Sequence, residues 1–354
     1  MTASNVIAFN RNPRTPGAAS PEGLIRATAL GRHGQDDVFW LKENAEVLSV
    51  LCALGRPVAP EALAPYEAFY DGLEERLRFY PQYYRFFLSM CLDLEDLGMP
   101  GRKGAALSRW VATVGLAQAE LSDLQRAEAM RLLARRGAVA APRPDELTER
   151  LHRFIDRSST FALPNRKAAY ELTHIVFYLS DYGRCDPGLS AAARVSLEYA
   201  GLIAFLDQDA DLLAEVCLGM RFAGQVPSLI WTQTVAEAHA AISPECQNGA
   251  PEAADGFHRY LVTGWERSVA GARAFGRPVP EGPVAFVDRA APQGALRPLS
   301  EWLFGLGGAR NGHWPDMRDR LVPMLDPQSR DILKRAEQSS SRFADFFAGF
   351  ARSA

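Results

Sequence analysis

The chain has 354 residues, a net charge of −3 at pH 7, 47% hydrophobic residues and 23% charged residues. This composition is ordinary for a globular protein of one large domain or two average ones. It argues against a nucleic-acid-binding protein, which usually carries a basic excess or a basic stripe. Apolar runs fall short of the roughly 18 residues that a membrane span needs, and the N-terminus lacks the features of a signal peptide. We therefore expect a cytoplasmic protein that binds neither nucleic acid nor membrane.

The predicted elements begin after a segment at 1–20 that is rich in Pro, Gly, Asn and Ser, which we expect to be a disordered or loosely docked arm. The rest, 21–354, is expected to form a single large helical domain, with a subdivision near 138–144 as the alternative. Helical periodicity, capping residues such as Asn165 and Ser190, and glycines at helix ends support this interpretation. Helices are predicted at 21–31, 36–55, 60–78, 81–97, 104–119, 123–136, 144–158, 165–182, 191–207, 209–223, 228–242, 254–274, 296–305, 315–325 and 327–351.

The sequence contains little sign of β-structure. Only 283–287 is predicted as a short strand, inside the longest break between helices at 276–294. A second break is predicted at 243–253. About fifteen helices joined by short links favour either an α/α barrel, or toroid, around a central pocket, or an irregular multi-helix bundle. We therefore predict an all-α fold of one of these two kinds.

The most informative segment is the apolar helix YELTHIVFYLSDYG at 170–183. Four of its side chains stand at offsets 0, 3, 7 and 10, on one stripe of a helix: Glu171, His174, Tyr178 and Asp181. Burying unpaired titratable groups is costly, so a buried stripe of this kind needs partners. We predict a catalytic pocket in which Glu171 or Asp181 orients His174 as a general base. Tyr178 would donate a hydrogen bond there. The alternative is that these groups only lock the helix into the core.

The same residues also suggest a metal site. An acidic residue precedes a histidine by three positions three times, as Glu171 and His174, as Asp255 and His258, and at 149 and 152. The pair at 149 and 152 lies in a strongly charged segment and is interpreted as a solvated helix face. Helical di-iron and di-manganese proteins use this spacing. Asp181 lies two turns beyond His174 and would be a fifth ligand. If a metal binds, we expect Fe, Mn or Zn at these five residues.

The segment at 170–183 resembles a recurrent stretch of bacterial all-helical proteins that are grouped as domains of unknown function. The resemblance implies an uncharacterised family and brings no activity or cofactor with it. The residues themselves lead to two hypotheses. The first is an enzyme of bacterial specialised metabolism or peptide modification that acts on a small molecule or peptide. The second is a non-catalytic binding or scaffold protein whose helical groove holds a peptide, a metabolite or a partner protein.

The C-terminal segment 342–350 carries phenylalanines at helical spacing. An apolar helix face of this kind packs on its own chain or, if it remains uncovered, on another protein. The sequence therefore predicts either a docked terminal helix or a homodimer formed through it.

Overall fold

The computed structural model describes residues 21–139, 146–247, 255–272, 274–289 and 293–352. These residues form an almost entirely helical fold, which confirms the predicted all-α class. The predicted arm at 1–20 lies outside them, as does most of the predicted boundary near 138–144. Across the same ranges, no helix combines the length and the apolarity that crossing a membrane requires.

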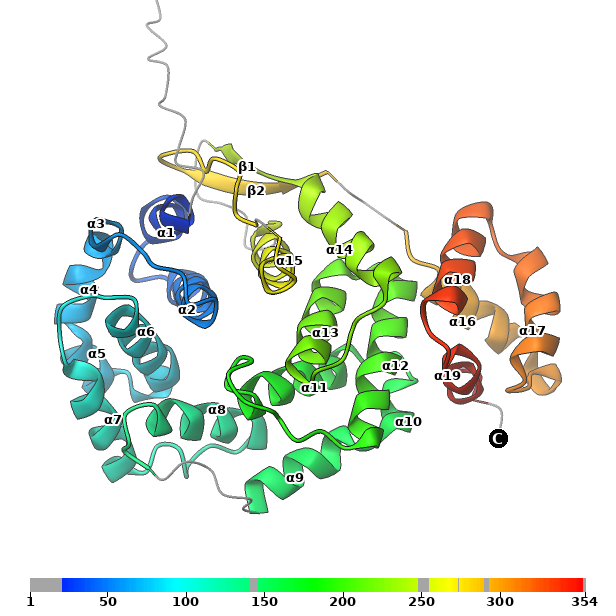
Figure 1. Cartoon of the computed structure of the whole chain (residues 1–354), viewed down its shortest axis with the longest axis horizontal. Helices are drawn as coiled ribbons and strands as arrows, with labels where there is room; N and C mark the ends of the chain where they lie inside the picture. The colour runs from blue at the N-terminus through cyan, green and yellow to red at the C-terminus, as the bar shows by residue number, and fades with distance from the viewer. Residues whose placement is uncertain (1–20, 140–145, 248–254, 273, 290–292, 353–354) are drawn as a thin grey trace, which may run out of the picture.

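The helices alternate along the chain between an outer layer and an inner ring (Figure 1). Each inner helix packs against the next one, and the last, α15, returns to the first, α2, so that the ring closes. Of the two predicted architectures, the structure is the α/α toroid. The inner ring consists of α2 (Val38–Ala53), α6 (Tyr84–Asp96), α8 (Asp123–Ala134), α11 (Arg166–Leu179), α13 (Ala210–Phe222) and α15 (Phe257–Val269).

The outer layer packs on the ring from outside. Three short 3-10 helices interrupt or extend the helices of the chain at 64–66, 81–83 and 307–309, and a fourth lies at 322–324. The outer helices are α1 (Pro21–Leu30), α3 (Pro60–Leu63), α4 (Glu67–Asp71), α5 (Leu73–Phe79), α7 (Lys103–Val114), α9 (Glu146–Ile155), α10 (Ser158–Phe161), α12 (Ala191–Asp207) and α14 (Leu229–Ala241).

Two of the predicted helices are divided in the structure. The predicted helix at 60–78 is broken into α3, α4 and α5, with Pro65 in the 3-10 turn and Gly72 at the second break. The predicted helix at 327–351 is divided into α18 (Pro327–Ser339) and α19 (Phe343–Phe350). The break falls at Ser340, whose backbone is extended and whose hydroxyl accepts a hydrogen bond from the amide of Arg342. A serine side chain that satisfies a nearby amide competes with the helix in this way.

A small antiparallel hairpin lies beside the ring closure. Strand β2 (Val284–Asp288) confirms the predicted strand at 283–287 within one residue. Its partner, β1 (Ile242–Cys246), falls at the start of the segment predicted as a break. This strand was missed because its sequence, ISPEC, does not alternate and its partner is distant in the chain. The amide of Val284 donates to the carbonyl oxygen of Gly31 at 2.9 Å, which ties the hairpin to the end of α1.

The C-terminal helices lie outside the ring, against α12 and α14 (Figure 1). They comprise α16 (Leu296–Gly305), α17 (Trp314–Leu321), α18 and α19. The four phenylalanines of α19 are at most 2% exposed. Two of them, Phe343 and Phe347, pack on Trp314 with ring centroids 4.9 and 4.8 Å away. The apolar face on which the predicted homodimer depended is therefore covered within the chain, because α19 docks on its own neighbours.

Candidate functional site

The ring encloses a cavity of about 240 Å³, to which all six inner helices contribute side chains. We call it the central cavity. Aromatic rings form part of its lining, including Phe177 and Trp265, whose ring centroids lie 5.2 Å apart. Its titratable side chains are Lys42, Glu46, Arg85, Glu128, His174, Tyr178, Tyr182, Glu215 and His258. So many ionisable groups around one small hollow make it the strongest candidate for a functional site in the described residues.

His174 reaches the central cavity from α11 and keeps 36% of its side chain exposed. Its Nδ1 lies 2.8 Å from the carbonyl oxygen of Tyr170, one turn earlier in the same helix. The same nitrogen lies 3.5 Å from Oε2 of Glu215 on α13. Because both neighbours are acceptors, they assign the hydrogen of the neutral ring to Nδ1. Nε2 is then the ring's hydrogen-bond acceptor.

His258 reaches the same cavity from α15. Its Nδ1 lies 2.9 and 3.0 Å from the two carboxylate oxygens of Asp211 on α13. Burial alone would lower the pKa of His258, but the hydrogen bond to Asp211 and the negative charges of Glu46 and Glu215 outweigh burial and raise it to about 9. His258 is therefore a cation at neutral pH.

Asp211 is the counter-ion of this cation. Burial alone would raise the pKa of its carboxyl, but hydrogen bonds with His258 and with the hydroxyl of Tyr170 outweigh burial and hold the pKa below its ordinary value. Asp211 and Glu215 stand four residues apart, on one face of α13. One helix thus supplies the carboxylate partner of each cavity histidine.

Two further carboxylates, Glu215 and Glu46, line the cavity. Glu215 is almost fully buried and accepts a hydrogen bond from the hydroxyl of Thr173 at 2.5 Å. Glu46 on α2 lies 3.8 Å from the ammonium group of Lys42. Burial raises the pKa of both carboxyls, while the cavity histidines partly oppose this effect.

The remaining charges of the lining are paired with each other. Arg85 on α6 forms an ion pair with Glu128 on α8, and its Nε lies 2.9 Å from Oε1 of Glu120. These contacts fix the guanidinium and link α6 to α8 at the edge of the cavity. Arg85 is therefore held as a stationary positive charge beside any molecule bound there.

The predicted stripe on α11 is only partly realised. His174 and Tyr178 both line the central cavity, whereas Glu171 is not among its lining residues. The helix begins after Asn165, whose side chain caps it as predicted, but it ends at Leu179. Asp181 has a positive φ of 44° and has left the helix. Its carboxylate turns outward and accepts a hydrogen bond from Nη1 of Arg131 at 3.0 Å.

Asp255 does not join His258 in the cavity. Both of its carboxylate oxygens bind Arg32, at 2.7 and 2.9 Å. Arg32 also binds both oxygens of Glu43 on α2, at 2.6 and 2.7 Å. Asp255 therefore contributes to the closure of the ring between α2 and α15.

The five predicted metal ligands thus lie in separate places. His174 and His258 line the central cavity, Asp181 faces Arg131, Asp255 binds Arg32, and Glu171 lies outside the cavity lining. Across the described ranges, no group of three or more His, Cys, Asp or Glu side chains is arranged to hold a metal ion. Fe, Mn or Zn at these five residues stays a prediction.

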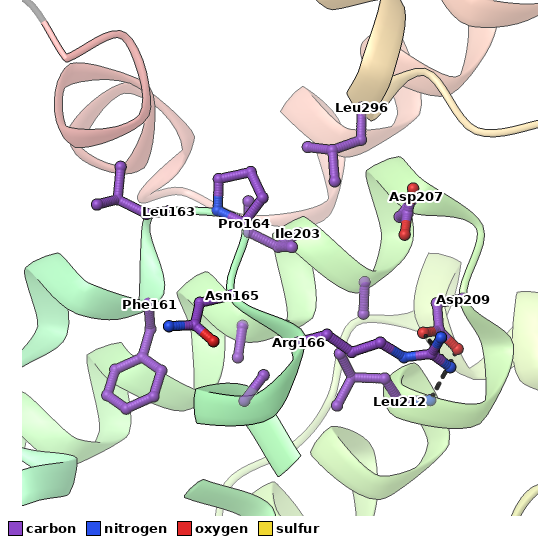
Figure 2. A pocket seen from close by; sticks show the side chains of 13 residues that line it. Phe161, Leu163, Pro164, Asn165, Arg166, Ile203, Asp207, Asp209, Leu212 and Leu296 are labelled. Carbon is purple, nitrogen blue, oxygen red and sulfur yellow. Dashed lines mark hydrogen bonds and ion pairs between the residues drawn. The ribbon is translucent and has the colours of Figure 1, made fainter. Parts of the chain in front are cut away.

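A smaller hollow of about 140 Å³ lies where Leu296 of α16 approaches α12 and the start of α11 (Figure 2). Its lining is mainly apolar. Its charged contact is the ion pair between Arg166 and Asp209, with Nη2 and Oδ2 3.1 Å apart. No histidine lines it. It has the character of a packing gap between the ring and the C-terminal helices.

The sequence-based site lacked Glu46 and Glu215, which line the cavity, and Asp211, the partner of His258. The signal for the two residues of α13 differs from that for Glu46. Asp211 and Glu215 had a usable signal, because they are acidic residues spaced by four positions in the otherwise apolar helix ADLLAEVCLGM. An acidic pair on a buried helix needs partners for the same reason as the stripe on α11. Glu46 had no comparable signal, because α2 carries several charged residues.

The fold and the site together define an α/α toroid whose centre holds two histidines paired with carboxylates. The chain belongs to the family described as Domain of unknown function (DUF6902), whose model matches residues 3–353. This confirms the uncharacterised family implied by the segment at 170–183. The comparisons with curated proteins and with solved structures each found no match to the chain.

Proposed function

We propose that this protein is an enzyme that transfers protons to and from a small molecule held in the central cavity. The observation that supports the proposal is that two histidines, His174 and His258, line one cavity in different hydrogen-bonding states. Each of them is oriented by a carboxylate from α13. A histidine positioned by a second group is the usual form of a general acid or base.

The two histidines have complementary roles in this proposal. His258, a cation at neutral pH beside Asp211, is the proton donor. His174, with its Nδ1 directed at the carbonyl oxygen of Tyr170, accepts a proton at Nε2. Removal of a proton from one substrate atom and delivery to another is the chemistry of isomerisation, elimination and hydrolysis. About a third of each imidazole side chain is exposed, so exchange with water restores both protonation states.

The size of the cavity limits the substrate. A volume of about 240 Å³ is smaller than most drug-sized binding sites. It suits one small metabolite, or a single residue at the end of a peptide, better than an extended peptide. Lys42, Glu46 and Arg85 offer both signs of charge for its polar groups. The alternative hypothesis, a protein that only binds, needs the shape and charge of the cavity but no proton donor beside a proton acceptor.

The proposal is tested by untargeted mass spectrometry of a polar metabolite extract incubated with the purified protein. His258→Gln removes the proton donor, and His313→Gln is a matched control at an exposed histidine of the C-terminal helices. We expect at least one compound to be consumed, with formation of an isomer or fragment, by the wild type and the control but not by His258→Gln. Equal conversion by all three proteins would contradict the proposal. A compound retained by the protein without any product would support the binding function instead.

A further inference from the structure

A second hollow is lined by residues of α8, α9, the end of α11 and the turn that follows it. Figure 1 shows where these elements lie in the fold. The volume of this hollow, about 530 Å³, exceeds that of the central cavity and falls within the range of small-molecule sites. We call it the lateral groove and define it by Met130, Arg131, Leu147, Leu151, His152 and Leu179. None of the functional roles proposed above uses it.

Most of the lateral groove is apolar. Leu151 is buried beneath it, while Met130, Leu147 and Leu179 are only half-buried and leave apolar surface in contact with water. Removing such surface from water is favourable, and an uncovered apolar concavity is typical of a binding site. The groove therefore favours an occupant with an apolar body.

One end of the groove contains a constrained positive charge. The side chain of Arg131 is 9% exposed, and its Nη1 donates to Oδ1 of Asp181 at 3.0 Å. The guanidinium lies over the ring of Tyr182, 4.6 Å from its centroid. Its Nε is buried and has no hydrogen-bond partner among the described residues. A ligand in the groove cannot reach this atom, but Nη2 is not buried in this way and makes no hydrogen bond among the described residues.

We propose that the lateral groove binds a medium-chain carboxylic acid, with the alkyl chain along Leu147 and Leu179 and the carboxylate at Arg131. A carboxylate supplies the acceptor that Nη2 lacks, and hydrogen bonds between two charged groups are stronger than neutral ones. An ammonium head group has no acceptor to offer. Two carboxylates also line the groove. Neither takes the place of the ligand's carboxylate, because Asp181 is already engaged by Nη1 of Arg131 and by Arg184, and Asp186 is exposed.

This inference does not depend on the proposed enzymatic function. The two sites share one wall, because Tyr178 lines both the central cavity and the lateral groove. Their ligands are nevertheless different in kind, since the central cavity is surrounded by charges and the groove by apolar side chains. Binding in the groove can therefore be measured without knowing the substrate of the cavity.

The test is isothermal titration calorimetry of the full chain with octanoate, below its micelle concentration, and with octylammonium. We expect saturable binding of octanoate and at least about tenfold weaker binding of octylammonium. Leu147→Trp, which fills the groove without a change of charge, should weaken octanoate binding at least about tenfold. Leu121→Trp, at a fully exposed leucine, is the matched control and should bind like the wild type.

A second variant tests the head-group contact. Arg131→Gln should weaken octanoate binding by about tenfold or more while reducing the preference over octylammonium. If this variant does not fold, Leu147→Trp still decides the location of the site. Absence of saturable octanoate binding, unchanged binding by Leu147→Trp, or equal affinity for octylammonium would overturn the proposal.

Discussion

Replacing His258 with glutamine is expected to lower the turnover number by about 10²- to 10⁴-fold, the usual contribution of a positioned proton donor. Glutamine keeps a polar side chain of similar reach beside Asp211 but has no proton to give. Asp211 retains its hydrogen bond from Tyr170 at 3.1 Å, so its carboxylate is not left without a donor. Because 37% of the His258 side chain is exposed, the melting temperature should change by only a few degrees.

The pH dependence of the enzymatic rate also follows from the role of His258 as proton donor. Since the pKa of His258 is raised to about 9, the donor is present below that pH and is lost as the pH rises through it. The wild-type rate should therefore fall above pH 9, and this fall should be absent from the residual activity of His258→Gln.

His174→Gln, which removes the proton acceptor, should reduce the rate to a similar extent as His258→Gln without loss of the fold. His313→Gln should behave like the wild type, and a His258→Gln protein with more than about a tenth of wild-type activity would be inconsistent with the donor role.

Replacing Arg32 with alanine is expected to destabilise the protein by about 3–5 kcal/mol, the cost of breaking a buried ion pair from one side. The guanidinium is 1% exposed, and it donates to both oxygens of Glu43 and both oxygens of Asp255. A further bond reaches the carbonyl oxygen of Val284 at 3.3 Å. The ring of Phe257 lies 4.6 Å from the guanidinium carbon. Alanine would remove the guanidinium from two carboxylates at the closure between α2 and α15, leaving Asp255 with two backbone amides and Glu43 with the ring of His33.

The measurement is the free energy of unfolding from urea titration of the wild type and three variants, Arg32→Ala, Arg289→Ala and Arg32→Lys. Arg289→Ala is the matched control, because Arg289 pairs with Glu245 on the same hairpin but is well exposed. Its loss should cost less than about 1 kcal/mol. Arg32→Lys should fall between the two, since an ammonium group cannot serve two carboxylates in bidentate fashion. An Arg32→Ala protein as stable as Arg289→Ala would show that the ring closure does not depend on this contact.

The fold was largely predictable because its signals are local. Apolar periodicity and caps such as Asn165 and Ser190 define most helices within a few residues, and both of these caps are observed. The strand β1 and the closure of the ring were not predictable, because both depend on partners far apart in the chain. Arg32 and Asp255, for example, are separated by 223 residues.

The residues of the candidate site also divide into those with a local sequence signal and those that depend on partners far away in the chain. His174 and Tyr178 were identified because four polar groups on one apolar helix are conspicuous in the sequence. Asp181 was placed on the same stripe because the helix was predicted to continue to 182, whereas it ends at Leu179 and the chain then turns with positive φ. The partner of His174 is Glu215, which only tertiary packing of α13 beside α11 brings within reach.

The most direct test of the central claim is an NMR titration of the histidine rings, with tautomers assigned from the ring nitrogens. The account predicts that His258 titrates near pH 9 and that Asp211→Asn lowers this pKa, because the hydrogen bond and charge that stabilise the cation are weakened. It also predicts that neutral His174 carries its hydrogen on Nδ1. A His258 that titrates at its ordinary value near 6.5, or a neutral His174 protonated on Nε2, would contradict the assignment of a proton donor and a proton acceptor to this cavity.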